Sequence, residues 1–304
     1  MTKYAFFEGA VTPIEQAKVS VMTHALHYGT ACFGGIRGYW NAQHENLYIF
    51  RLRDHFERFL MSTRLLLMKL PYSVDDLVAI TLDLARREDL HQDIYIRPLA
   101  YKAEKIIGVR LHDLRDELTI YAQPFGRYIE SEEGARVCTS SWRRVDDTSI
   151  PARGKLSGAY VNSAFIKSEA QLNGFDEAIV LNPDGHVSEG SAENLFIVRK
   201  QTLITPPVND NILEGITRRT LMDLATTELG LTVVERSIDR TELYVADEAF
   251  FCGTGVQVAA IASVDRRPVG SGKMGPITNQ LRDLYFDVVR GNVPHYRDWC
   301  TPVY

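Results

Sequence analysis

Hydrophobic residues recur at helical spacing in four segments of the chain. In residues 54–68, Phe56, Phe59 and Leu67 fall on one face of a helix, and Asp54 is a favourable first residue. The same spacing predicts four helices, over 54–68, 75–87, 161–173 and 217–229.

Glycine and proline mark where two of these helices end and where one chain reversal lies. Gly174 follows 161–173 and Gly230 follows 217–229, and glycine readily takes the left-handed conformation that ends a helix. Residues 182–185 read Asn-Pro-Asp-Gly, which predicts a tight turn because proline fixes one dihedral and glycine accepts the other.

Short runs of β-branched, aliphatic and aromatic residues predict strands between the helices. They are 47–50, 94–101 and 117–123 in the first part, and 136–142, 177–182, 195–199, 231–237 and 248–252 in the richer second part. Strands and helices do not alternate in a regular βαβ rhythm, so we expect an α+β fold and no doubly wound sheet.

The polar stretch 124–134, which begins Pro-Phe-Gly, predicts a linker. It divides the chain into a small N-terminal α/β domain, 1–123, and a larger strand-rich domain, 135–304. We find no internal repeat and no low-complexity segment.

Composition narrows the class of protein. The chain has 304 residues, 45% of them hydrophobic and 24% charged, with a net charge of -5, which is ordinary for a globular protein. No Lys/Arg stripe favours nucleic-acid binding, and no apolar run is long enough to cross a membrane. The N-terminus lacks the apolar core of a signal peptide, so we expect a cytoplasmic protein with reduced thiols.

The cysteines and histidines give no metal-ligand spacing, and we expect no metal. The four cysteines are Cys32, Cys138, Cys252 and Cys300.

Two stretches supply groups that pyridoxal phosphate requires. Lys155 lies between Gly154 and Gly158, where small residues allow the backbone to approach a bulky planar ligand, and a lysine amine can form an imine with an aldehyde. Burial among apolar groups would depress the pKa of such a lysine and free its amine. Glu193 precedes an apolar strand, where a carboxylate needs a cation such as a protonated pyridine, and Glu189 is the rival acid.

The phosphate group requires donors, and three segments offer them. Residues 214–217 open a predicted helix, whose first N–H groups and dipole favour an anion. The turn 253–255, Gly-Thr-Gly, presents further backbone amides, and Arg58 adds a full positive charge.

These segments together resemble the branched-chain aminotransferase family of fold type IV pyridoxal phosphate enzymes, the group with a D-amino acid aminotransferase-like fold. The match runs in order along nearly the whole chain and includes the specific motif Glu-Gly-x-x-Glu-Asn-Leu-Phe. It rests on His24-Ala25-Leu26-His27-Tyr28-Gly29, Arg58, Tyr95-Ile96-Arg97-Pro98, Gly154-Lys155, Ser188-Glu189-Gly190 through Asn194-Leu195-Phe196, Gly215-Ile216-Thr217 and Gly253-Thr254.

The resemblance implies a role for each cofactor residue. Lys155 is expected as the catalytic Schiff-base lysine, Glu193 at the ring nitrogen and Tyr160 at the phenolate oxygen. The residues expected at the phosphate are Arg58, Ile216, Thr217 and Thr254.

The substrate pocket must accept an apolar side chain and the γ-carboxylate of glutamate by turns. The candidates for its walls are Tyr28, Phe33, Gly35, Tyr95, Val109 and Tyr128, and Arg97 is the candidate cation. By the same resemblance, the amides of the Thr254-Gly255 turn bind the substrate α-carboxylate. Tyr28 and the Val109 loop come partly from a neighbouring subunit, which implies at least a homodimer.

Several positions depart from the family pattern or carry unassigned charge. The sequence after Thr254 is Gly-Val-Gln where many relatives carry alanines, and Phe125 replaces a tryptophan found in some, so the breadth of substrates stays open. Arg37, Arg110 and Arg127 are interpreted as surface charges, with acceptance of a carboxylate by one of them as the alternative.

We therefore expect an aminotransferase that transfers the amino group of branched-chain L-amino acids to 2-oxoglutarate, with small molecules as its partners. The alternatives are a D-amino acid or (R)-amine aminotransferase, an aminodeoxychorismate lyase, or a non-catalytic pyridoxal phosphate carrier.

Overall fold

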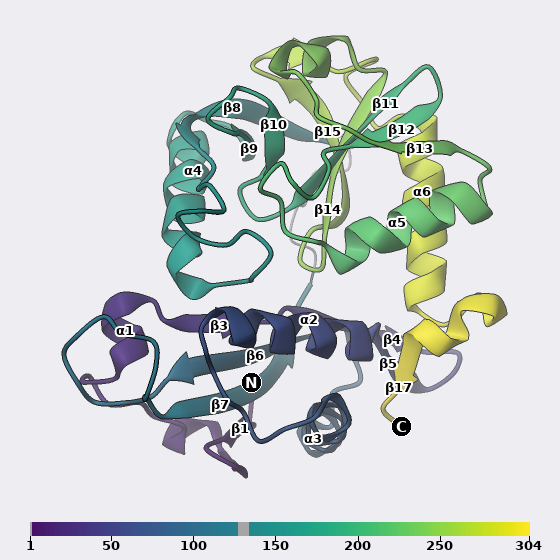
Figure 1. The fold of residues 1–304 in the computed structure, drawn as a ribbon. Coiled ribbons are helices and arrows are strands. Elements are labelled where there is room, and N and C mark those ends of the chain that lie inside the picture. The colour runs from purple at the N-terminus through teal and green to yellow at the C-terminus, as the bar shows by residue number, and fades with distance from the viewer. Residues whose placement is uncertain (1, 127–133) are drawn as a thin grey trace. The chain divides into compact units, whose positions relative to one another are not determined.

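The computed structural model describes residues 2–126 and 134–304, which form two compact units (Figure 1). The described residues of the first unit fall within Met1–Gly126, Gly154–Ala159 and Asp287–Tyr304, and those of the second within Arg127–Arg153 and Tyr160–Phe286.

The first unit is built on an eight-stranded sheet in the order β17-β5-β4-β6-β7-β1-β2, with β3 paired to β6. The strands are β1 Tyr4–Phe7, β2 Ala10–Pro13, β3 Ala31–Phe33, β4 Ile36–Asn41, β5 Asn46–Phe50, β6 Ile94–Lys102, β7 Asp116–Pro124 and β17 Cys300–Pro302. β6 pairs antiparallel with β7 along its whole length. Because side chains alternate along a strand, Tyr95 and Arg97 lie on the same, half-buried face of β6.

Two helices cover this sheet. The α-helices are α1 His24–Tyr28, α2 Leu52–Leu65 and α3 Val74–Glu88, and the short 3-10 helices are η1 Ile14–Gln16, η2 Ser157–Ala159 and η4 Pro294–Trp299. α2 packs against α3 and β3, and α3 packs against β1 and β7. The helix expected from Asp54 begins earlier, at Leu52. Asp54 is not its cap but lies in the first turn, 3.6 Å from Arg51.

The second unit is built on a nine-stranded sheet in the order β10-β9-β8-β15-β14-β11-β12-β13, with β16 paired to β15. Most neighbours are antiparallel, but β8 runs parallel to β9 and β15, and β12 runs parallel to β13. The strands are β8 Ala135–Arg143, β9 Glu177–Leu181, β10 Val187–Gly190, β11 Asn194–Arg199, β12 Thr202–Thr205, β13 Thr232–Glu235, β14 Glu248–Gly253, β15 Gln257–Val264 and β16 Arg267–Pro268.

Helices pack on this sheet at two places. The helices of the second unit are α4 Tyr160–Leu172, α5 Ile216–Thr227, the 3-10 helix η3 Arg240–Val245 and α6 Pro276–Val289. The last residues of α6 belong to the first unit. α4 covers β8 and β9, with Ile166 and Ala170 buried against Val180, and α5 packs on β13 and β14. Gly174 and Gly230 follow their helices with positive φ, as expected.

The units differ from the ranges expected from the sequence at two segments. Residues 154–159 pack in the first unit because Leu156 forms a β-bridge with Cys32, and residues 287–304 do so because β17 pairs with β5. The assignment 1–123, 124–134 and 135–304 remains a prediction.

Within residues 2–126 and 134–304, no helix combines the length and apolar character that crossing a bilayer requires.

Candidate active site

The backbone of Lys155 is fixed by the first unit. Its carbonyl accepts a hydrogen bond from the Phe33 N–H (3.0 Å), and its N–H donates to Ser62 Oγ (3.2 Å). Ser62 in turn donates to the carbonyl of Arg58 (3.0 Å), so one turn of α2 connects both predicted cofactor residues. Ser62 is buried, and no sequence signal had marked it.

The glycines beside Lys155 contact the protein itself. A Cβ at Gly154 would lie 2.6 Å from Leu65 Cδ1, and a Cβ at Gly29 would lie 2.8 Å from the Gly158 backbone. The sequence predicted that Gly154 and Gly158 admit a planar ligand. In the structure Gly154 packs against Leu65 and Gly158 against Gly29, which holds the Lys155 backbone in place, and the expected approach of a ligand remains a prediction.

Two positively charged side chains, those of Lys155 and Arg97, lie close to the ring of Phe33. Its centroid lies 5.2 Å from Lys155 Nζ and 4.5 Å from the Arg97 guanidinium. The amine of Lys155 and the guanidinium of Arg97 therefore both lie near one apolar ring within the first unit.

Tyr95 extends this surface. Its hydroxyl accepts a hydrogen bond from Arg97 Nη2 (3.2 Å), and its ring lies 5.1 Å from that of Phe125. Gly35 is required here, because a Cβ would collide with the Tyr95 hydroxyl. The buried Arg97 Nε makes no hydrogen bond to the described residues, so this guanidinium retains a donor.

Two other predicted pocket residues, Tyr28 and Val109, are connected through Gly108. The Tyr28 hydroxyl accepts a hydrogen bond from the Gly108 N–H (3.1 Å), which places it beside the loop that carries the exposed Val109. Tyr128 lies outside the described residues.

One charge was wrongly interpreted. Arg37 is not a surface residue: it is buried, and its guanidinium donates to the carbonyls of Phe125 (3.1 Å) and Gly126 (2.6 Å). A buried guanidinium requires acceptors for its N–H groups, and these two carbonyls both accept from its Nη2. Arg110 is exposed, and Arg127 lies outside the described residues.

In the second unit, Glu193 is a buried carboxylate. It accepts a hydrogen bond from the Ala192 N–H (2.9 Å), and Gly190 leaves room for it. Burial, and then the negative charge of Glu177, raise the pKa of Glu193 to about 8. A positively charged partner would favour its ionised form.

Glu189 is already paired. It forms an ion pair with Arg144 (2.7 Å) and accepts hydrogen bonds from Asn194 Nδ2 (2.9 Å) and the Leu213 N–H (3.1 Å). Glu189 therefore fixes the loop before α5, and its charge is neutralised.

The predicted phosphate segments lie next to Glu193 in the second unit. α5 begins at Ile216, with the buried Thr217 after it and Gly215 packed against Asn194, so its first N–H groups have no partner within the helix. The turn containing Thr254 and Gly255 joins β14 to β15, and its first residue, Gly253, lies beside Glu193 because β14 pairs with β11. Tyr160 is the first residue of α4.

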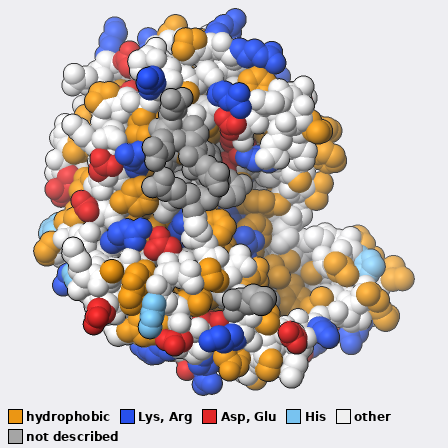
Figure 2. Space-filling view, turned by 180° about the vertical axis from the view of Figure 1, so that it is seen from behind, with side chains coloured by type: hydrophobic (Ala, Val, Ile, Leu, Met, Phe, Trp, Pro, Cys, Tyr) orange, Lys and Arg blue, Asp and Glu red, His pale blue; other side chains and the backbone are white. Residues whose placement is uncertain are grey.

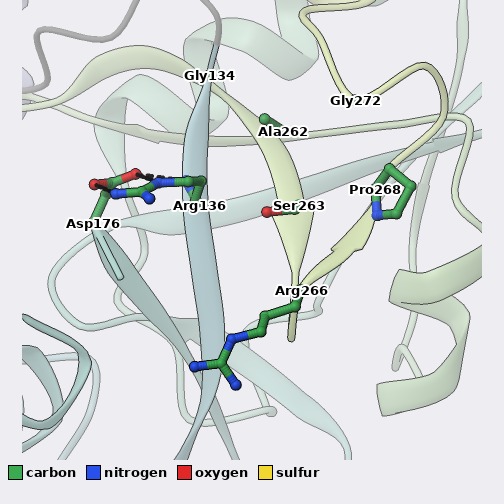
Figure 3. Close-up of a pocket in the computed structure, with 8 residues that line it drawn as sticks. All are labelled: Gly134, Arg136, Asp176, Ala262, Ser263, Arg266, Pro268 and Gly272. Carbon is green, nitrogen blue, oxygen red and sulfur yellow. Dashed lines mark hydrogen bonds and ion pairs between the residues drawn. The ribbon is translucent and has the colours of Figure 1, made fainter. Parts of the chain in front are cut away.

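A separate pocket of the second unit has a volume of about 540 Å³ (Figure 3). β8 and β15 form its wall, and Arg136 points to Asp176, which accepts hydrogen bonds from its Nε (3.2 Å) and Nη2 (3.1 Å). None of the described site residues lines this pocket.

The chain is similar throughout to known proteins. The amino-transferase class IV family model matches residues 32–264. A probable branched-chain-amino-acid aminotransferase from Aquifex aeolicus (strain VF5) is 50% identical over 301 residues, which are 99% of this chain and 97% of that protein.

Solved structures agree. A branched-chain aminotransferase from Thermoproteus uzoniensis with norvaline has a TM-score of 0.96 and 43% identity, covering 100% of both chains. A T.th. branched-chain amino acid aminotransferase complexed with N-(5'-phosphopyridoxyl)-L-glutamate has a TM-score of 0.95 and 39% identity, covering 100% of this chain and 99% of that one.

The chain therefore belongs to the class IV aminotransferase family. It is an aminotransferase that uses pyridoxal phosphate, and the expected fold type and family are confirmed.

The residues present fit this cofactor. The first unit offers a half-buried lysine beside an apolar ring, and the second offers a buried carboxylate with a raised pKa next to amide-rich turns. These groups match an aldehyde, a basic ring nitrogen and a phosphate.

Proposed function

We propose that this protein transfers the amino group of branched-chain L-amino acids to 2-oxoglutarate. The observation that carries the proposal is that the centroid of the Phe33 ring lies near both Lys155 Nζ (5.2 Å) and the Arg97 guanidinium (4.5 Å). An apolar wall suits a branched side chain, and the adjacent guanidinium suits the second carboxylate of glutamate. The relatives' complexes support both kinds of substrate: the norvaline complex supports an apolar side chain, and the phosphopyridoxyl-L-glutamate complex supports glutamate.

Seven residues are proposed to hold the cofactor. When bound, pyridoxal phosphate supplies an aldehyde carbon for the amino group and a ring that accepts electrons from the substrate Cα. The residues proposed at its phosphate are Arg58, Ile216, Thr217 and Thr254, with Tyr160 at the phenolate oxygen, Glu193 at the ring nitrogen and Lys155 at the aldehyde carbon.

Glu193 is favoured over Glu189 at the ring nitrogen. Glu189 is neutralised by Arg144, whereas burial makes Glu193 a costly anion without a cation facing it. Glu193 therefore holds a proton at the ring nitrogen, which keeps the cofactor ring electron-poor.

Lys155 is proposed as the base at the substrate Cα. Its Nζ removes the Cα proton. The hydrogen bonds of its backbone to Phe33 and Ser62 fix the position from which the side chain extends. Packing around Gly154 and Gly158 holds the backbone on both sides of this lysine.

The remaining residues are proposed to select the substrate. Its side chain contacts Tyr28, Phe33, Gly35, Tyr95, Val109 and Tyr128. The Thr254-Gly255 amides bind its α-carboxylate, and Arg97 binds the γ-carboxylate when glutamate or 2-oxoglutarate enters.

We also propose a homodimer, on the basis of an exposed apolar surface around α1. This α1 patch consists of Val19, Val21, Met22, Leu26, Ile107 and Val109, all more than half exposed. Figure 2 shows hydrophobic side chains gathered over the part of the first unit that carries α1. Large exposed apolar patches mark protein interfaces in soluble proteins.

A cytoplasmic location is proposed as well. All four cysteines are free and buried, which fits a reducing compartment.

A half-reaction panel tests the activity. We expect L-leucine to change the cofactor absorbance of the loaded protein rapidly, and 2-oxoglutarate to restore it. A response to D-alanine or (R)-1-phenylethylamine alone would indicate the related aminotransferases, pyruvate release without 2-oxoglutarate would indicate the lyase, and no response to any amine would indicate a carrier.

A further inference from the structure

His24 lies at the start of α1 and has no role in the proposed chemistry. Its side chain is fully buried. Nδ1 lies 2.8 Å from Thr30 Oγ1, and Nε2 lies 2.7 Å from the carbonyl oxygen of Gly108. A carbonyl only accepts, so Nε2 must donate, and in the neutral ring Nδ1 then accepts from the Thr30 hydroxyl.

The Gly108 peptide is held on both sides. Its carbonyl accepts from His24, while the N–H of the same residue donates to the Tyr28 hydroxyl (3.1 Å). His24 and Tyr28 also contact each other, with ring centroids 4.7 Å apart. The result is a closed unit of two α1 side chains and one residue of the loop that follows β6 (Figure 1).

This loop connects β6 to β7, and its start is held by the His24 N–H, which donates to the Glu104 carbonyl (2.9 Å), but few contacts within the chain hold the residues that follow. The side chains on either side of Gly108 point to solvent: Ile107 is 96% exposed and Val109 75%. Gly108 has a φ of +134°, a conformation that L side chains rarely adopt, although a Cβ there would meet nothing within 4 Å. Within one chain, hydrogen bonds and not packing therefore set where Val109 lies, and in the proposed dimer Val109 also belongs to the α1 patch.

We propose that His24 is a positioning residue that fixes the Gly108 peptide, and through it Tyr28 and Val109, for recognition of the substrate side chain. The effect on substrate recognition rests on the proposed function, in which Tyr28 and Val109 contact the substrate. The hydrogen-bonded unit itself does not depend on it.

Two substitutions of His24 test separately the hydrogen bonds made by Nε2 and by Nδ1. The amide of His24→Gln reaches the position of Nε2 and can still donate to Gly108, whereas the shorter His24→Asn reaches only the position of Nδ1. His44→Asn is the matched control, since the His44 ring also bonds a hydroxyl, that of Tyr48 (3.1 Å), in the turn between β4 and β5.

Hydrogen exchange of residues 104–112 in the loaded protein is the first readout. We expect His24→Asn to speed exchange there by roughly three- to ten-fold, the effect of one net hydrogen bond, and His24→Gln and His44→Asn to leave it within about two-fold of wild type. Tyr28→Phe removes the acceptor of the Gly108 N–H and should speed exchange of that amide even if His24→Asn fails to fold.

Steady-state kinetics are the second readout. His24→Asn should raise the KM for L-leucine by roughly three- to ten-fold with little change in kcat, and His24→Gln should restore it. Unchanged exchange in His24→Asn and Tyr28→Phe, or equal defects in the Asn and Gln variants, would overturn the proposal. Failure of the wild type to use leucine would instead refute the proposed function and leave the exchange result valid.

Discussion

At the scale of the residue, burial and ion pairing give the two glutamates of one motif, Glu189 and Glu193, different environments. The sequence predicted that Glu189 or Glu193 meets the cofactor nitrogen, but their spacing alone favours neither. In the structure Arg144 pairs with Glu189, and Glu193 is buried with a raised pKa. Only their neighbours in the folded structure distinguish Glu189 from Glu193.

The raised pKa of Glu193 predicts a pH-dependent stability of the cofactor-free protein. Between its ordinary pKa of 4.5 and the folded value of about 8, the carboxyl is protonated when folded and ionised when unfolded. Stability from this group is present below pH 4.5 and is lost as the pH rises to about 8. Glu193→Gln removes this loss, so its thermal midpoint should exceed that of wild type at about pH 8.5 but not at about pH 5.

Glu57→Gln, a change at an exposed glutamate of α2, is the control and should show no such difference. A Glu193→Gln midpoint that tracks wild type at both pH values would refute the raised pKa.

Arg97 is expected to serve one class of substrate. Arg97→Ala should lower kcat/KM for glutamate and 2-oxoglutarate by roughly 10- to 100-fold, because a charged hydrogen bond is lost, and affect L-leucine much less. Arg64→Ala, at an exposed arginine of α2, is the control. Equal losses for leucine and glutamate would make Arg97 structural.

At the scale of the element, α4 is tied to β9 by an ion pair between the partly exposed Lys167 and the buried Glu177. Lys167 Nζ lies 2.6 Å from Glu177 and also donates to the carbonyl of Asp176 (2.8 Å). Glu177 is fully buried and is one source of the raised pKa of Glu193. The α4–β9 contact therefore affects the electrostatics of the candidate site.

Breaking this pair from one side should be costly. Lys167→Met leaves Glu177 buried without its cation, and we expect it to lower the free energy of unfolding by about 3 kcal/mol. The double variant Lys167→Met with Glu177→Gln should regain much of this loss. Urea denaturation of all three proteins measures both values; a double variant no more stable than the single one would argue against an ion-pair effect.

The four helices predicted from hydrophobic periodicity are present in the structure. α2, α3, α4 and α5 lie within a few residues of their expected ranges. β4 was not predicted because Arg37 and Gly38 interrupt its apolar run, although nearly all its residues are buried. α6 was missed although Leu281, Tyr285 and Val288 are buried at helical spacing, so its signal was present in the sequence.

At the scale of the whole molecule, two segments far apart in the sequence complete the first unit. Residues 154–159 join it through Cys32 and Leu156, and residues 287–304 through β17. Periodicity describes local structure, so no pattern in these residues could predict such long-range pairing. The family motif nevertheless singled out Lys155 before its neighbours were known.

The proposed dimer makes a prediction at the same scale. Leu26→Asp places a charge in the α1 patch and should convert the dimer to a monomer in sedimentation velocity, with loss of activity toward leucine. Leu172→Asp, at another exposed leucine, the last residue of α4, should remain dimeric. A monomeric wild type, or a dimer lost only in Leu172→Asp, would rule out the α1 patch as the interface.

The central claim is that the side chain at position 155 binds the cofactor covalently. Borohydride reduction of the loaded protein, followed by digestion and mass spectrometry, tests it directly. The account predicts a phosphopyridoxyl label on the peptide that contains Lys155 and none in Lys155→Ala. A label on another lysine, such as Lys102 or Lys167, or no label in the wild type, would contradict it.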